Sequence, residues 1–344
     1  MNDAAIAIPC RIELVVSLLF RLNSLFLFFC RSVPRDFFRI LLDERRQILS
    51  HNFCGGLAGD LSLIFLHYYL LRRRLTGDYY SFLDDVFSTY ASAYAEGYWK
   101  TRIAGHFRRI VWNELRDHVK PGGLAFDLGA GSGMDSVFLA KAGMKVIAWD
   151  ISREMVRIMT QRIVRENLQD MITIEHQGSN NVPDLAARDP HAFDLILSNF
   201  GALNSEPNLP RLVPHFHKLL RNDGVFFGTI YNKFSLYETM GAFLKADFEK
   251  LTRRFRNMTC TEIGALRYPV TVYTPANFRS ILRPYFRTVM QRGILMGLPS
   301  LNMLRVVESI PRQVLEMEHV LSNLMEHFPF LWLSDQFMNV ARPS

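Results

Sequence analysis

Cysteine is scarce in this sequence, because only four cysteines stand among its 344 residues and no two of them form a C-x-x-C pair. Cys10, Cys30, Cys54 and Cys260 lie too far apart for a small disulfide framework or for the closely spaced ligands of a structural zinc site. We therefore predict no metal site and a reducing compartment, so that the expected location is cytoplasmic.

Long uninterrupted hydrophobic runs are also missing, although 49% of the residues are hydrophobic. A membrane-spanning helix needs about 20 apolar residues, but the apolar stretch 11–31 is interrupted by Arg21 and the stretch 61–74 ends in three arginines. We predict that residues 1–84 form an apolar helical N-terminal extension. Four interpretations of it stay open: peripheral contact with a membrane surface, packing on the core, a targeting segment, and a mis-called start.

Concentrated positive charge is absent from the middle of the chain. The formal net charge is +7, yet residues 124–235 carry 11 basic and 12 acidic side chains, so the excess lies on the flanks. An enzyme that acts on nucleic acid more often shows a dense basic stripe beside its site. This distribution therefore argues against a nucleic-acid partner.

What the sequence does contain is a glycine-rich turn in the segment LAFDLGAGSGMD, residues 124–135. An apolar strand precedes the turn, a helix follows it, and a second strand, KVIAWD, ends at Asp150. In such a β-turn-α-β unit, backbone N–H groups and a helix N-terminus come close to a ligand, and glycines leave room for it. The carboxylate that ends the second strand is placed to accept both ribose hydroxyls of a nucleoside.

A dinucleotide-binding fingerprint would need a third glycine at the position of Met134, where it is absent. The pattern D-x-G-x-G-x-G, which begins at Asp127, instead resembles the cofactor signature of class I S-adenosylmethionine (SAM) methyltransferases. The resemblance implies SAM as cofactor, S-adenosyl-L-homocysteine as product, and an acid that helps to hold the amino-acid portion of SAM. The implied contacts in this unit are Asp127, Gly129, Ala130, Gly131, Gly133, Asp150 and Ile151.

The elements that follow alternate as a parallel α/β sheet requires. Ser152 is predicted to cap a helix that runs to Asn167, and Thr274 a later helix with Pro275 at its first position. With the resemblance, this order predicts a Rossmann-like seven-stranded sheet with helices on both faces, in a domain over residues 85–344. The strands are expected at 124–128, 145–150, 171–179, within 193–204, at 224–232, near 287–294 and, antiparallel, at 335–343.

The sequence departs from the family pattern at some of its acids. In FSTYASAY, which resembles the segment that folds over the cofactor, Ser88 and Ala95 replace two acids and leave the contact to Tyr94 alone. After the third strand, GSN stands where many members carry G-D. The resemblance therefore implies that Ser179 or Asn180 binds the amino group of the adenine.

The segment after the fourth strand, SNFGALN, resembles a sequence found in many bacterial small-molecule methyltransferases and adds Asn199 to the predicted cofactor contacts. It is not the N-P-P-aromatic motif of enzymes that methylate exocyclic amines of nucleic-acid bases. This departure again argues against a nucleic-acid substrate.

No catalytic residue is assigned from the sequence. The methyl carbon of SAM is already electrophilic, so an enzyme needs mainly to align the acceptor, and a general base is needed only when the acceptor must lose a proton. His106, His176, His215 and His217 are more typical of surface or core histidines than of a base. Tyr231, at the end of the fifth strand, is the better candidate.

We predict a SAM-dependent methyltransferase that acts on a small, partly apolar acceptor. Insertions near 236–270 and 295–334 are expected to build the acceptor pocket, a homodimer surface or part of the core. Two alternatives stay open: a non-catalytic SAM-binding regulatory or assembly protein, because acids of the pattern are altered, and an NAD-type oxidoreductase, which the missing glycine disfavours.

Overall fold

The computed structural model describes residues 79–96, 101–244, 258–263, 266–296, 298, 315 and 322–344. All of them belong to one compact unit, Ile64–Ser344. Residues 1–78 of the predicted extension 1–84 lie outside the described residues. The suggested membrane contact falls on this part of the chain. The first described helix, α4 (Tyr79–Glu96), begins before the predicted boundary at 85. The division into two domains stays a prediction.

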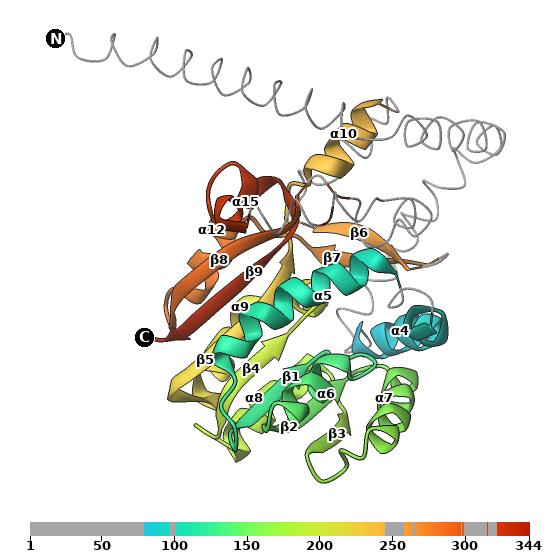
Figure 1. Ribbon diagram of the computed structural model, residues 1–344, viewed down its shortest axis with the longest axis vertical. Coiled ribbons are helices and arrows are strands. Elements are labelled where there is room, and N and C mark those ends of the chain that lie inside the picture. Colours follow the sequence, from blue (N-terminus) through green and yellow to red (C-terminus); the bar gives the residue numbers. More distant parts are fainter. Residues whose placement is uncertain are drawn as a thin grey trace. The chain divides into compact units, whose positions relative to one another are not determined.

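A seven-stranded sheet forms the centre of the described chain (Figure 1). Six strands run in one direction, and the last strand of the sequence runs antiparallel to both of its neighbours. The predicted fold is therefore confirmed, including the antiparallel seventh strand. In spatial order the strands are β3 (Ile172–His176), β2 (Lys145–Asp150), β1 (Leu124–Leu128), β4 (Phe193–Ser198), β5 (Leu220–Tyr231), β9 (Ser334–Pro343) and β8 (Phe286–Met296).

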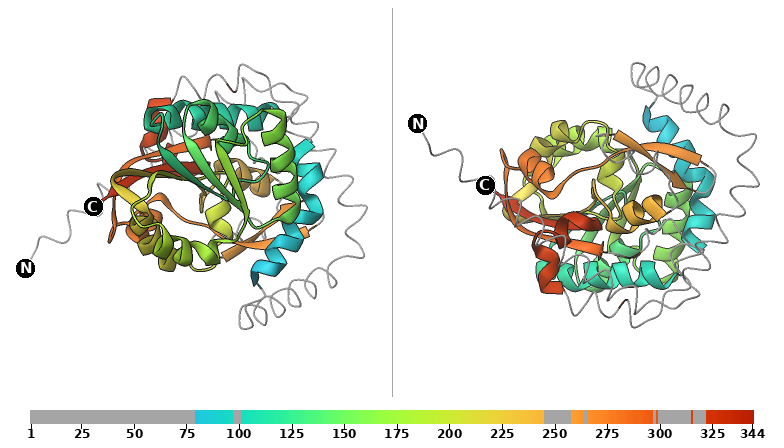
Figure 2. Two further views of the ribbon diagram at one scale, coloured as in Figure 1. Left: turned by 90° about the horizontal axis from the view of Figure 1, so that it is seen from below. Right: turned by 90° about the horizontal axis from the view of Figure 1, so that it is seen from above.

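Helices cover both faces of this sheet (Figure 2). Alternate residues of a strand point to opposite faces, so Ala125 packs in one hydrophobic core and Phe126 in the other. The first core is shared with α5 (Arg102–Leu115), α6 (Met134–Lys141) and α7 (Arg153–Arg165). The second is shared with α8 (Val182–Arg188), α9 (Leu209–Leu219) and α12 (Pro275–Leu282). Short helical turns lie at η2 (Arg116–His118), η3 (Ser179–Asn181), η4 (Ala202–Ser205), η5 (Ser322–Glu326) and α15 (Phe330–Leu333).

The predicted helix starts are confirmed. The hydroxyl of Ser152 accepts a hydrogen bond of 3.1 Å from the backbone N–H of Met155, which caps α7. The hydroxyl of Thr274 likewise accepts from Asn277 at 3.1 Å, with Pro275 at the first position of α12. Strand β5 begins at Leu220, earlier than the expected 224, because Leu220 pairs with Phe193 ahead of a register shift in that ladder.

The first predicted insertion contains α10 (Leu236–Leu244) and a two-stranded antiparallel hairpin. The hairpin is formed by β6 (Met258–Ile263) and β7 (Leu266–Thr271), and its strands were not predicted. Pro269 lies inside β7, and a proline within a run of residues argues against a strand unless the strand lies at the edge of a sheet. In a two-stranded hairpin both strands are edge strands, so the proline is tolerated here. Most of the second insertion lies outside the described residues. Within the part that the structure describes, no helix is long and apolar enough to cross a membrane.

Candidate functional site

A cavity lies at the carboxyl ends of β1, β2 and β4, where ligands bind in parallel α/β sheets. Seven of the eleven predicted cofactor contacts line it: Gly129, Ala130, Gly131, Asp150, Ile151, Ser179 and Asn199. Asp127, Gly133 and Asn180 do not line it. The side chain of Tyr94 lies outside the described residues. The structure thus brings most of the predicted site residues together, and their roles toward a cofactor stay predictions.

The three glycines of the first loop all have left-handed backbone angles, with φ of 76°, 56° and 76° at Gly129, Gly131 and Gly133. A Cβ atom on the first would lie 2.5 Å from the Cβ of Ala202, and on the third 2.6 Å from the Cγ of Met159. A Cβ on Gly131 would meet nothing within 4 Å. Two glycines therefore allow close packing inside the protein, whereas the middle one leaves open space at the cavity.

Asp150 is fixed at the edge of this space. Its two carboxylate oxygens accept hydrogen bonds from the backbone N–H groups of Gly131 (2.7 Å) and Ser152 (2.8 Å). Burial raises the pKa of Asp150 to about 6, although these two hydrogen bonds favour the charged form. The carboxylate keeps lone pairs for a ligand, since each oxygen accepts one of these two hydrogen bonds and can accept another.

Asp127 is buried beneath the loop rather than in the cavity wall. Its carboxylate accepts a hydrogen bond of 2.5 Å from the hydroxyl of Ser136. Burial, together with the nearby charge of Asp135, raises the pKa of Asp127 to about 8. Asp127 therefore contacts the first turn of α6 and does not line the cavity. The acid that lines the cavity is Asp135, which belongs to that first turn.

Asp135 stands in a polar cluster that sequence reasoning missed. It accepts hydrogen bonds from the indole of Trp112 (2.6 Å) and the amide of Asn199 (2.9 Å), and the Nε of Arg108 lies 3.6 Å from it. The guanidinium of Arg108 lies 5.0 Å from the ring centroid of Phe200 and 5.7 Å from that of Trp112. A buried cation and a buried anion thus face the same end of the cavity. The sequence does hold one indication of this cluster, because Arg108 and Trp112 are four residues apart and therefore lie on the same face of a helix.

A second acid that the sequence did not reveal is Glu206, which is 4% exposed and also lines the cavity. Its Oε2 accepts hydrogen bonds from the hydroxyls of Ser179 (2.5 Å) and Tyr80 (3.0 Å), and its Oε1 accepts from the backbone N–H of Asn208 (2.9 Å). Burial and then the charge of Glu206 hold the pKa of Tyr80 well above its usual range. Asn180, the other predicted adenine contact, donates to Asn181 instead.

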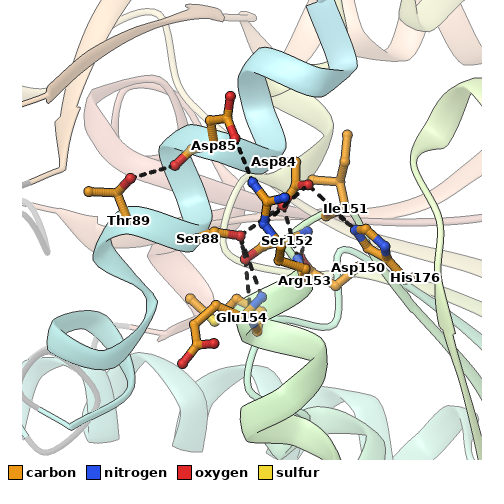
Figure 3. A network of polar contacts seen from close by, with 11 residues as sticks. Asp84, Asp85, Ser88, Thr89, Asp150, Ile151, Ser152, Arg153, Glu154 and His176 are labelled. Atoms are coloured by element: carbon orange, nitrogen blue, oxygen red, sulfur yellow. Dashed lines mark hydrogen bonds and ion pairs between the residues drawn. The ribbon is translucent and has the colours of Figure 1, made fainter.

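Helix α4 is held against the N-terminus of α7 by a network of polar contacts (Figure 3). The first N–H groups of a helix lack partners within the helix. Here Asp84 accepts from the backbone N–H of Arg153 at 3.0 Å, and Ser88 accepts from that of Glu154 at 3.4 Å. Ser88 also shares a hydrogen bond of 2.9 Å with Ser152. The residue that replaces an acid of the family pattern therefore fastens α4 in place.

This attachment places an apolar wall along the cavity. Leu83 and Phe87 of α4 line it, and the ring of Phe87 packs edge-on against Tyr268 of β7 with centroids 5.1 Å apart. Phe200 and Tyr231 line the cavity from the ends of β4 and β5. The predicted insertion between β5 and α12 thus contributes to the wall through Tyr268.

Histidines take no place in the cavity wall that the structure describes. His176 lies at the end of β3, where its Nε2 is 2.7 Å from the backbone oxygen of Ile151. His106 is buried in α5, with Nδ1 3.0 Å from a guanidinium nitrogen of Arg109. His217 of α9 packs near Tyr285 and Phe286. Of the candidates for a base, Tyr231 lines the cavity.

Residues 125–224 match a family model described as a methyltransferase domain. This segment of the chain is similar to methyltransferase domains. The matched range covers the glycine loop, β2, β3, β4 and the start of β5, and therefore the strand ends at which the cavity lies. The open space at Gly131 beside Asp150 has the position at which the sequence resemblance predicts a nucleoside cofactor, SAM.

Several curated proteins match part of the chain. An uncharacterised protein of Methanocaldococcus jannaschii is 29% identical over 146 residues, which are 42% of this chain and 52% of that protein. The erythromycin 3''-O-methyltransferase of Saccharopolyspora erythraea is 29% identical over 136 residues, 38% and 43% of the two chains. The ribosomal protein L11 methyltransferase of Syntrophomonas wolfei is 31% identical over 122 residues, 35% and 37%. The matches span about half the length of these relatives or less.

A similar solved structure is that of a putative SAM-dependent methyltransferase from Listeria monocytogenes. It has a TM-score of 0.49 and 15% sequence identity, and the alignment covers 70% of this chain and 99% of that one.

Proposed function

We propose that this protein binds SAM in the cavity and transfers its methyl group to a small-molecule acceptor. The observation that carries the proposal is the open space at Gly131 directly beside the buried carboxylate of Asp150, at the carboxyl ends of parallel strands. A loop that only turned tightly would need no such space. A nucleoside whose ribose hydroxyls donate to Asp150 would occupy it.

The remaining polar groups of the cavity suit the other parts of SAM. Arg108 and Asp135 lie at one end and carry charges opposite to those of an amino acid's carboxylate and ammonium group. Asn199 donates to Asp135 and thereby orients it. Ser179 lies at the other end, where the resemblance places the adenine. When bound, SAM supplies the electrophilic methyl group, and the residues of the protein supply orientation.

The apolar wall supports a small acceptor with apolar or aromatic character. Phe87, Tyr268 and Phe200 can exclude water and fix a flat ligand by packing, which aligns its nucleophilic atom with the methyl group. Orientation of this kind is worth roughly 7–11 kcal/mol in favourable reactions. A homodimer, and membrane contact through the N-terminal residues, stay predictions from the sequence.

The test is calorimetry of the purified protein with SAM and with NAD, followed by incubation with methyl-labelled SAM and a metabolite extract. We expect SAM binding at micromolar affinity or better, no binding of NAD, and transfer of label to small molecules. Binding without transfer to any acceptor would support the non-catalytic alternative. Binding of NAD alone would overturn the proposal.

A protein acceptor is the second candidate, because two of the curated relatives are ribosomal protein L11 methyltransferases. The same labelled SAM can be incubated with ribosomal proteins. Label in a protein band and none in the metabolite fraction would favour this candidate over a small-molecule acceptor.

A further inference from the structure

The contacts of Glu206 determine which way the hydroxyl hydrogens at its end of the cavity point. A carboxylate only accepts hydrogen bonds, and each hydroxyl has a single hydrogen to donate. Ser179 and Tyr80 both donate that hydrogen to the Oε2 atom of Glu206, at 2.5 Å and 3.0 Å. Their lone pairs are therefore what they offer to a ligand.

The position of Glu206 is itself fixed. Its Oε1 atom accepts from the backbone N–H of Asn208, which holds the carboxylate at the start of α9. The residue is 4% exposed, and Glu206, Ser179 and Tyr80 come from three separate segments that all line the cavity. A ligand group that approaches this edge meets only hydrogen-bond acceptors. Binding is favourable when the group is a donor, because a buried polar group without a hydrogen-bond partner lowers the binding free energy.

We propose that Glu206 is a specificity-determining residue that selects a nucleoside with an exocyclic amino group over one with an oxo group at the same position. It acts through Ser179 and Tyr80, and takes over the task of the acid that is missing after β3. The proposal rests on the proposed function, since it assumes that the adenine of SAM lies at this end of the cavity.

The chemistry separates two ligands that differ at one position of the purine. S-adenosyl-L-homocysteine carries a 6-amino group, which donates two hydrogens. Its deaminated analogue, S-inosyl-L-homocysteine, carries a 6-oxo group, which accepts and would face the lone pairs of Ser179 and Tyr80. A site that is built for a donor and is left facing an acceptor loses the hydrogen bond and keeps the desolvation cost.

Calorimetry with these two compounds tests the proposal. For the wild-type protein we expect tighter binding of the amino compound by about 10- to 100-fold. Glu206→Gln preserves the shape but gives the side chain a donor, which frees the hydroxyl hydrogens to point into the cavity. The ratio of the two affinities should then fall by about tenfold. The control Glu166→Gln removes the same charge directly after α7, where Glu166 pairs with Lys141 outside the cavity, and should keep the wild-type ratio.

A second variant keeps the test independent of how well Glu206→Gln folds. Ser179→Ala leaves Glu206 bonded to Tyr80 and Asn208, and should lower the affinity for the amino compound more than that for the oxo compound. An unchanged ratio in both variants would overturn the role of Glu206 while SAM binding itself stood. A wild-type protein that binds neither compound would overturn the proposed function instead.

Discussion

The carboxylate of Asp150 accepts a hydrogen bond of 2.7 Å from the backbone N–H of Gly131, 19 residues earlier in the chain. This bond fastens the glycine loop after β1 to the end of β2. It sets the acid next to the one loop glycine whose missing Cβ leaves open space at the cavity. The two parts of the proposed ribose site, the loop after β1 and the acid at the end of β2, are therefore held together before a ligand binds.

Replacing Asp150 should weaken SAM binding more than it weakens the fold. Asp150→Ala removes the acceptor for the ribose hydroxyls, and hydrogen bonds to a charged group are worth about 1.5–3 kcal/mol. We expect the dissociation constant for SAM to rise by the corresponding factor, about 10- to 150-fold, measured by calorimetry on a variant whose thermal unfolding remains cooperative. Wild-type affinity in the folded variant would contradict the ribose assignment.

SAM affinity should depend on pH through the same residue. The pKa of Asp150 is raised to about 6 by burial, so the carboxylate is charged at pH 7.5 and largely protonated at pH 5. Only the charged form can accept both ribose hydroxyls, and the affinity is expected to fall as the pH decreases through 6. Calorimetry at several pH values measures this. The fall should be absent from Asp150→Asn, which does not titrate.

The buried acid Asp127 predicts a pH dependence of stability. Its pKa is about 8 in the folded protein, above the ordinary value of 3.8, so its contribution to stability is full below pH 4. That contribution decreases as the pH rises, by at most about 1.4 kcal/mol per pH unit, until pH 8 is passed. Asp127→Asn stays neutral, and should therefore gain in unfolding free energy relative to wild type between pH 5 and pH 8. Urea titrations at three pH values test this, and a constant difference would refute it.

Side chains at Gly131 should block the cofactor. Gly131→Val places methyl groups in the open space beside Asp150, and we expect no measurable SAM binding. The matched control is Gly122→Val, because Gly122 also has a positive φ, of 78°, and an equally open Cβ position but does not line the cavity. Both variants carry a similar backbone strain of about 1–2 kcal/mol. Equal loss of SAM binding in the two would mean that strain, and not the cavity, is responsible.

The sequence predicted the sheet because its strands are local apolar runs in a fixed order, each bounded by a turn or a cap. The same holds for the glycine loop and Asp150, whose spacing follows from one β-turn-α-β unit. Asp135 carried a signal as well, as a polar residue in the first turn of α6, but the neighbouring Asp127 matched the family pattern more directly. Whether Asp127 or Asp135 faces the cavity depends on how the turn packs against the rest of the protein. The sequence pattern contains no information on that packing.

Glu206 could not be predicted because its role is set by tertiary structure. It lies 27 residues from Ser179 and 126 from Tyr80, in a short segment between η4 and α9 with no periodic pattern. The hairpin of β6 and β7 was missed for a different reason. Its strands pair only with each other, and Pro269 in β7 is typical of a loop.

The attachment of α4 to α7 gives the last prediction. Ser88 donates to Asp84, accepts from the N–H of Glu154, and shares a hydrogen bond with Ser152, which in turn donates its backbone N–H to Asp150. Ser88→Ala leaves a part-buried N–H in the first turn of α7 without this acceptor, while the cap Ser152 remains. Loss of a side-chain acceptor at a helix start costs about 0.5–2 kcal/mol. We expect the unfolding free energy to fall by about that amount.

The same substitution should also weaken SAM binding, because α4, which carries Phe87 and Leu83 of the cavity wall, loses part of its attachment to α7. This effect should be smaller than that of Asp150→Ala, since no group that contacts the ribose is removed. Thr89→Ala is the control, because Thr89 is exposed on the same helix and donates only to the backbone of Asp85. If both alanine variants behave alike, then the contacts of Ser88 do not fasten α4. The apolar wall would then be held by the remaining contacts, such as the hydrogen bond of Asp84 to the N–H of Arg153 and the packing of Phe87 against Tyr268.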